Sequence, residues 1–168
     1  MAQILEEALE IGEDAQKGKY LTFALGGDEY GIEIRHVTEI IGLQVITEVP
    51  EFTGYLKGII NLRGKIIPVI DVRLRFRKEE KDYNDRTCTI VIQVKGISVG
   101  LIVDNVAEVL SISQENIVPP PNLSSDYQNK FIKGIGKIDS SVKLILDCDS
   151  LLSDFAMKTV TLMDDFSC

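Results

Sequence analysis

Few side chains in this sequence are placed to do covalent chemistry. The only histidine is His36, in "IRHVTEII", and a lone histidine beside a strand is far more often a packing or surface residue than a general base. The cysteines, Cys88, Cys148 and Cys168, show no CxxC spacing, and no cysteine–histidine cluster has metal-ligand spacing. The "GIG" at 134–136 lacks the helix that phosphate binding requires. The sequence therefore predicts no catalysis, no metal and no cofactor.

One arginine is instead placed for recognition. In "YLKGIINLRGKIIPVIDVRLRF" (55–76), "IINL" and "KIIPVID" are predicted strands and "LRGK" is a β-turn between them. Gly64 would supply the positive φ of a type II turn, which leaves Arg63 exposed at the turn tip beside Asn61. A guanidinium there can pair with a carboxylate through two bonds, and Glu39 or a partner protein could supply it. The alternative is a solvated arginine that contributes little.

An internal repeat bears on this choice. "YGIEIRHVTEII" (30–41) aligns without gaps on "VGLIVDNVAEVL" (99–110) at a shift of 69 residues, and "YLKGI" (55–59) aligns on "FIKGI" (131–135) at a shift of 76. The matched pairs include Gly31 with Gly100, Val37 with Val106, Glu39 with Glu108 and Asp71 with Asp147. The turn that matches "LRGK" is "IDSS" (138–141), so the repeated unit closes this turn without arginine or glycine. The architecture alone does not demand Arg63.

The elements that must position these residues are predicted to be strands. Between Tyr20 and Leu152, short runs of Ile, Val and Leu are punctuated by glycine, which is typical of small sandwiches and barrels. With the repeat, we expect an all-β fold of two similar barrels, at about 20–76 and 88–152, joined near "RKEEKDYNDRT" (77–87). Either each barrel is contiguous in sequence or the two copies exchange strands.

Helix is expected to be scarce. Apolar residues at three- and four-residue spacing predict short helices at 51–57 and 125–133, ended by Gly58 and Gly134 at the position after the helix. Further short turns are expected after the last strand of each barrel. The acidic arm, residues 1–18, carries Ile4, Ala8 and Ile11 at helical spacing, and predicts a peripheral helix or a frayed end. Residues 153–168 are predicted to be a tail.

"IIGLQVITEVP" (40–50) is more apolar than one small barrel needs. As a strand it would carry Ile41, Leu43 and Val45 on one face and Ile40, Gln44 and Ile46 on the other. A small barrel buries only one face, so the second face is either covered by the other barrel or is an apolar patch that binds a protein.

The composition limits the classes of partner. Lys and Arg total 18 against 26 Asp and Glu, and the resulting net charge of -8 disfavours nucleic acid and anionic membrane surfaces as partners. The odd number of cysteines suits a reducing compartment. The N-terminus lacks the features of a signal peptide, and no apolar run approaches the ~18 residues of a membrane span. A cytoplasmic protein is expected.

Several of these motifs together resemble a known family. "GIINLRGKIIPVIDVRLRF", "YGIEIRHVTEII", "VGLIVDNVAEVL", "PPP" (119–121) and "FIKGIGKIDSSVKLILDCDSLL" resemble the bacterial chemotaxis coupling protein family CheW, in family order over most of 20–152. The resemblance implies a CheW-like domain over 19–152, built of two SH3-like five-stranded barrels with short helices. It also implies a non-catalytic adaptor that is monomeric when isolated and joins the histidine kinase CheA to the cytoplasmic tips of chemoreceptors in arrays.

The resemblance also implies two contact sites. The receptor-binding groove of the family carries over to Val37, Glu39, Gly58, Asn61, Arg63 and Gly100. The contact with the CheA regulatory domain matches the apolar set Ile41, Leu43 and Val45, on the barrel predicted near 20–76. The alternatives are a CheW-like module of another two-component signalling assembly and, from a different class, a small nucleic-acid-binding barrel.

Overall fold

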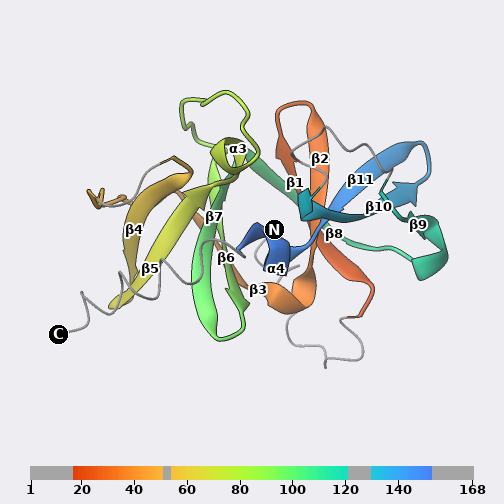
Figure 1. Cartoon of the computed structure of the whole chain (residues 1–168), viewed down its shortest axis with the longest axis horizontal. Coiled ribbons are helices and arrows are strands. Elements are labelled where there is room, and N and C mark those ends of the chain that lie inside the picture. The colour runs from red at the N-terminus through yellow and green to blue at the C-terminus, as the bar shows by residue number, and fades with distance from the viewer. Residues whose placement is uncertain (1–16, 51–53, 121–129, 153–168) are drawn as a thin grey trace.

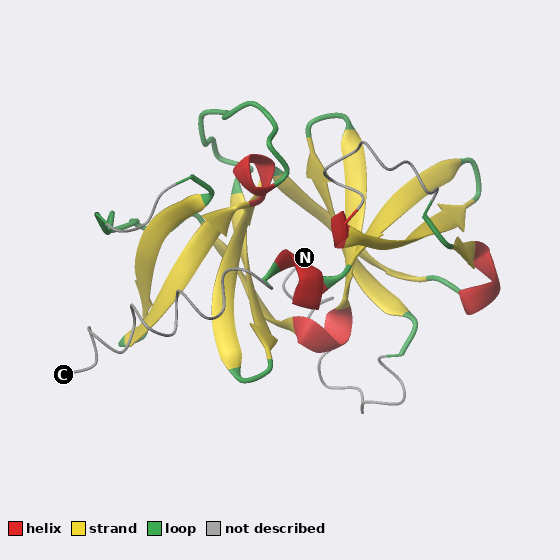
Figure 2. Cartoon of the chain, viewed as in Figure 1, coloured by secondary structure: helices red, strands yellow, loops and turns green. Residues whose placement is uncertain are grey.

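A computed structural model describes residues 17–50, 54–120 and 130–152 of the chain. Eleven strands dominate it, and the helices are single short turns (Figure 2). One sheet contains β1 (Lys19–Leu25), β2 (Asp28–Glu33), β8 (Asn105–Ser111), β9 (Ile117–Val118), β10 (Ile132–Ile138) and β11 (Ser141–Leu146). The other contains β3 (Val37–Gly42), β4 (Leu56–Leu62), β5 (Lys65–Asp71), β6 (Cys88–Val94) and β7 (Ile97–Val103). The fold is two SH3-like barrels, here named the β1 barrel and the β6 barrel, and the all-β prediction is confirmed.

The two sequence copies exchange strands, so that the β6 barrel is the contiguous run β3 to β7 and the β1 barrel combines β1 and β2 with β8 to β11. The sheet orders are β8-β1-β2-β11-β10-β9 and β3-β6-β7-β5-β4. After β2 the chain crosses through η1 (Ile34–His36) and adds β3 to the β6 barrel, and after β7 it crosses back and adds β8 to the β1 barrel (Figure 1). The ranges 20–76 and 88–152 therefore do not delimit the barrels, because each barrel takes strands from both halves of the sequence.

The strand registers follow the repeat. In the β6 barrel, Val69 of β5 pairs in parallel with Gly100 of β7. In the β1 barrel, Ile145 of β11 pairs in parallel with Gly31 of β2. Val69 and Ile145 are related by the shift of 76 residues found in the sequence, and Gly31 and Gly100 by the shift of 69. The two repeated segments thus occupy equivalent positions, as expected for a duplicated unit.

A short helix follows the last hairpin of each copy. Asp71 accepts a hydrogen bond from the Arg73 amide at the start of α3 (Val72–Arg75), and Asp147 accepts from the Asp149 and Ser150 amides at the start of α4 (Cys148–Leu151). An aspartate at the N-cap satisfies amide groups that a helix start leaves unpaired. The match of Asp71 with Asp147 in the sequence is therefore a match of two helix caps.

The barrels share one apolar junction. The largest core cluster includes Phe23 and Tyr30 of the β1 barrel together with Ile90 and Leu101 of the β6 barrel, all fully buried. At its centre the buried Arg75 guanidinium lies 4.3 Å from the Tyr55 ring centroid and 4.7 Å from that of Phe131. Tyr55 and Phe131 are themselves equivalent at the shift of 76. Arg75 thus contacts equivalent aromatic residues of both copies.

Of the two predicted helices before the glycines, 51–57 is turn and strand in its described part, whereas 125–133 keeps a short 3₁₀ turn at Lys130 and Phe131 before its strand begins. Residues 51–53 and 125–129 lie outside the described part, but Leu56 begins β4 and Ile132 begins β10. The registers shift between Leu56 and Gly58 and between Ile132 and Gly134, so both glycines stand at β-bulges rather than at helix ends. Pairing with β5 and β11 overrides the three- and four-residue apolar spacing, because it satisfies the backbone along the whole strand.

The two bulge glycines offer a matched stability test. Gly58 has φ +149°, and a Cβ there would lie 2.2 Å from the carbonyl oxygen of Thr47, whose backbone bonds Ile59 twice. A Cβ at Gly134 would clash with the Ile117 Cγ2 methyl, at 2.7 Å, and would lie at an ordinary contact distance of 3.5 Å from the Val118 carbonyl oxygen. We expect Gly58→Ala to lower the free energy of unfolding by about 3 kcal/mol, and Gly134→Ala by about 1 kcal/mol. Urea unfolding measures both; equal losses would contradict the backbone clash.

Candidate functional site

Arg63 lies at the tip of the β4–β5 hairpin. Both turn residues have positive φ, 53° at Arg63 and 87° at Gly64. The turn is therefore type I′ rather than the predicted type II, because a two-residue hairpin turn of this type matches the right-handed twist of its strands. The Asn61 Oδ1 accepts a hydrogen bond from the Gly64 amide at 2.8 Å and fixes the turn. By fixing the turn, Asn61 also fixes the backbone from which the Arg63 side chain extends.

The predicted partner of Arg63 is confirmed. Arg63 donates to both carboxylate oxygens of Glu39, with Nη2–Oε1 at 2.5 Å and Nη1–Oε2 at 3.3 Å. Glu39 lies on β3 and Arg63 beside β4, which are the two edge strands of the β6 barrel sheet, and the Thr47–Ile59 bridge joins the same edges. Hydrogen bonding to Glu39 and its charge raise the pKa of Arg63. The pair spans the two edge strands at the surface, and 71% of the Arg63 side chain stays exposed.

The equivalent hairpin of the β1 barrel turns without such a pair. Asp139, which matches Arg63, also has positive φ, 51°, and the Ser141 hydroxyl donates to the Ile138 carbonyl at 2.9 Å. The repeated unit thus closes this turn with local backbone contacts. The guanidinium of Arg63 is an addition to the fold rather than a requirement of it.

The other three receptor-site residues implied by the resemblance are buried. Val37 is 3% exposed in the shared core, and Gly58 is buried at its bulge. Gly100 lies on the central strand β7, where a Cβ would meet Thr89 and Val69 at 2.8 Å. The structure brings Glu39, Asn61 and Arg63 together at one surface, whereas Val37, Gly58 and Gly100 shape the backbone and core beneath the β6 barrel sheet.

The predicted apolar strand 40–46 ends early. β3 stops at Gly42, and residues 43–46 form an irregular segment before Thr47. The predicted alternation of side chains between the two faces of a strand therefore ends at Gly42. Ile41 packs against the β6 barrel core, whereas Leu43 is 39% and Val45 89% exposed. The strand exchange also places this segment on the β6 barrel, not on a contiguous barrel of residues 20–76.

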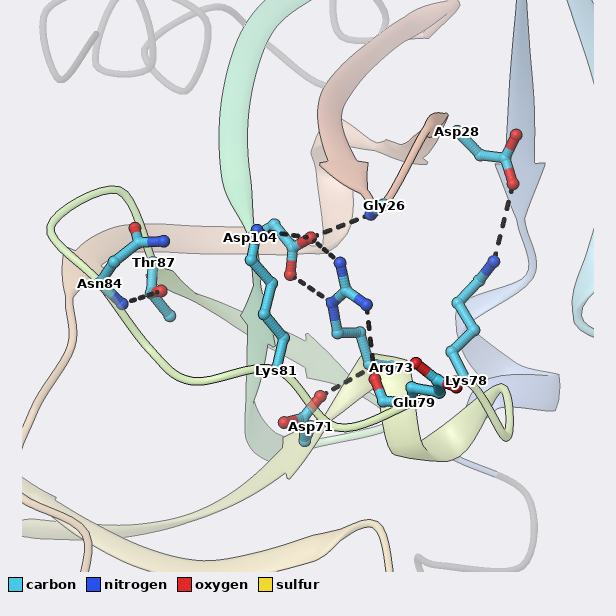
Figure 3. A network of polar contacts seen from close by, with 10 residues as sticks. All are labelled: Gly26, Asp28, Asp71, Arg73, Lys78, Glu79, Lys81, Asn84, Thr87 and Asp104. Atoms are coloured by element: carbon cyan, nitrogen blue, oxygen red, sulfur yellow. Dashed lines mark hydrogen bonds and ion pairs between the residues drawn. The ribbon is translucent and has the colours of Figure 1, made fainter.

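A polar network that the sequence analysis missed joins the barrels. Asp104, where the chain crosses from β7 to β8, accepts two hydrogen bonds from the Arg73 guanidinium and one from the Gly26 amide (Figure 3). Lys81 approaches the same carboxylate at 3.9 Å. The repeat held a signal, because the residues equivalent to Arg73 and Asp104 are Asp149 and Arg35, with both charges reversed.

This network predicts a pH-dependent stability. Burial raises the pKa of Asp104, but hydrogen bonds from Arg73 and Gly26 outweigh it and hold the pKa below its usual value. A lowered pKa contributes stability above the unfolded value near 3.9, and that stability is lost as the pH falls through the folded pKa. We expect Arg73→Leu to cost about 2 kcal/mol at pH 7, since it removes two of the three hydrogen bonds to a largely buried carboxylate.

The check is urea unfolding of the wild type and Arg73→Leu at pH 7 and at pH 3. The difference between the two proteins should shrink toward pH 3, because Asp104 takes up a proton more readily in Arg73→Leu than in the wild type, where Arg73 holds its pKa down. In the Asp104→Asn background, which has no titrating group at this position, the cost of Arg73→Leu should not depend on pH. A cost that stays constant in the wild-type background would contradict this role of the ion pair.

Known proteins match this architecture. Residues 19–156 match the model of the CheW-like domain. The chain is 35% identical over 142 residues to the chemotaxis protein CheW of Klebsiella aerogenes, covering 84% of this chain and 86% of that protein. It is 34% identical over 134 residues to CheW of Bacillus subtilis, covering 80% and 86%. The crystal structure of the scaffolding protein TtCheW from Thermoanaerobacter tengcongensis superposes with a TM-score of 0.72 at 38% identity, covering 77% of this chain and 88% of that one.

The family match extends over both barrels, and no helix within the described residues is long and apolar enough to cross a membrane. The relatives are chemotaxis proteins of similar length, and the solved structure is that of a scaffold. The chain therefore belongs to the CheW-like family, as a non-catalytic coupling protein of bacterial chemotaxis.

Proposed function

We propose that this coupling protein joins the cytoplasmic tips of chemoreceptors to the regulatory domain of the histidine kinase CheA, and that it works in the cytoplasm. Two surfaces of the β6 barrel carry the two contacts. The receptor contact is centred on Glu39, Asn61 and Arg63, with Val37, Gly58 and Gly100 supporting it from within. The kinase contact is centred on Leu43 and Val45, with Ile41 anchoring their segment to the core.

The observation that carries the receptor contact is an exposed ion pair that the fold does not need. Arg63 has five N–H donors, and its bidentate pair with Glu39 uses two of them. The Glu39 carboxylate holds the guanidinium in one orientation, which reduces the entropy lost when a partner binds. A receptor carboxylate or backbone carbonyl would be the matching acceptor.

The kinase contact rests on exposed apolar side chains. Among the described residues, the large hydrophobic side chains that are well exposed are Leu43, Val45, Ile66 and Val142. Leu43 and Val45 are the two that lie close together in sequence, on an irregular segment beside an edge strand. Exposed apolar groups that gather in this way mark protein-binding surfaces.

Chemical-shift mapping on the isotopically labelled chain tests both contacts. A receptor-tip fragment should shift the amides of residues 39 and 61–64, whereas the CheA regulatory domain should shift those of residues 41–46. Because the contacts are separate, saturation with one ligand should leave the shifts caused by the other largely unchanged. Shifts confined to the β1 barrel with either ligand would contradict the proposed sites.

A further inference from the structure

Among the described residues, the β1 barrel has a smaller apolar cluster than its twin, made of the buried Tyr20, Ile112 and Ile145. A cluster of five apolar residues fills the β6 barrel: Ile60, Ile67, Val69, Val91 and Ile102. Their counterparts at the repeat shifts are Gly136, Lys143, Ile145, Thr22 and Glu33. The registers support this match, since Ile60 pairs with Ile67 and Gly136 with Lys143. Four of the five apolar positions have become glycine or a polar residue in the β1 barrel.

An open groove of about 740 Å³ lies in the β1 barrel. Its apolar lining includes the buried side chains of Tyr20, Ile112 and Ile145 and the half-buried Ile117. The groove is far larger than the volume of one water molecule. Removing its apolar side chains from water would contribute favourably to the free energy of binding a segment there.

The charged lining of the groove is mainly basic. Lys17 and Lys133 line it together with Glu33. Glu33 pairs with both Lys133 and the Arg35 Nε, the latter at 2.6 Å, so two cations share one carboxylate here, and Lys17 adds a third positive charge to the lining. In a chain of net charge -8, this is a site where an acidic segment would be attracted rather than repelled. The occupant should therefore combine apolar side chains with carboxylates.

We propose that the chain's own N-terminal segment, residues 1–16, docks in this groove. The segment has five carboxylates and no Lys or Arg, and Ile4, Ala8 and Ile11 recur at the spacing of one helix face. It continues directly into Lys17, which itself lines the groove. A tethered segment acts at a high effective concentration, so weak contacts are enough to hold it.

Zero-length carbodiimide cross-linking of the full chain, followed by peptide mapping, tests this proposal. Lys133 should form cross-links with carboxylates of residues 1–16. Ile11→Ser should reduce their yield by about tenfold, because it removes an apolar side chain from the contact without adding a reactive carboxylate. In an equal mixture of ¹⁴N- and ¹⁵N-labelled protein, the cross-linked peptides should come from one chain, as docking of the chain's own segment requires.

Lys57 is the matched control, because it is the residue equivalent to Lys133 in the β6 barrel. Its Nζ lies 3.0 Å from the Glu80 carboxylate, so the Lys57–Glu80 product should report that the reaction works. Lys57 should form no cross-link with residues 1–16. Three results would overturn the proposal: the Lys57–Glu80 product without any Lys133 product to residues 1–16, products of mixed isotope only, or a yield unaffected by Ile11→Ser.

Discussion

Arg63→Ala is expected to weaken binding of a receptor-tip fragment by about 30-fold or more, because truncating a charge that is hydrogen-bonded across an interface leaves its partner unpaired. The denaturant midpoint should stay close to that of the wild type, since the Arg63 side chain is 71% exposed. Arg63→Lys should not restore binding, because an ammonium group lacks the planar fork of donors. Titration with the fragment and urea melting of each variant are the two measurements.

The equivalent turn provides the control for this variant. Asp139 matches Arg63 and also has positive φ, so Asp139→Ala makes a similar change to the backbone preference. It should leave receptor binding intact. The charge swap Arg63→Glu with Glu39→Arg should keep an ion pair across the barrel without restoring receptor binding. If Arg63→Ala melts early and binds normally once folded, the arginine is a structural residue and the proposed receptor contact is wrong.

Val45→Asp and Leu43→Asp are expected to weaken binding of the CheA regulatory domain by about 30-fold or more each, as for central interface residues. Val45 is 89% exposed, so Val45→Asp should leave the free energy of unfolding nearly unchanged. Leu43 is 39% exposed, and Leu43→Asp should cost about 1 kcal/mol. Neither variant should alter receptor binding, because the contacts are separate. Binding titrations with both ligands, together with urea melting, measure these effects.

Val142→Asp serves as the control for the kinase contact. Val142 is an apolar residue of β11 in the β1 barrel that is 52% exposed, so its replacement removes a comparable surface group. Kinase binding should be unaffected. Unfolding caused by Leu43→Asp alone would show that Leu43 is a core residue, whereas normal kinase binding by folded Val45→Asp would rule out the proposed surface.

The sequence predicted those parts of the fold that repeat. Gapless matches such as Gly31 with Gly100 predicted the duplication, and the strand registers bear this out. The match of Asp71 with Asp147 marked equivalent helix caps. The ion pair of Arg63 with Glu39 was predictable because a turn tip has few acceptors and the sister turn lacks the arginine.

The sequence could not predict what depends on pairing between distant segments. The exchange of β3 and β8 is set by which sheet edge each strand meets after the crossing, and local periodicity carries no information about it. The bulges at Gly58 and Gly134 were mistaken for helix ends, because a glycine after a short apolar run is typical of both a helix end and a bulge. The bonds from Arg73 to Asp104 span 31 residues and follow from the exchange.

Co-sedimentation of purified CheA with receptor-containing membranes tests the coupling role most directly. CheA should pellet with the membranes far more when the wild-type chain is present than when it is absent. Arg63→Ala should remain in the supernatant with CheA, whereas Val45→Asp should pellet and leave CheA behind. Equal recovery of CheA in the pellet with and without the wild-type chain would contradict the account. Recovery with both variants that equals recovery with the wild type would contradict it as well.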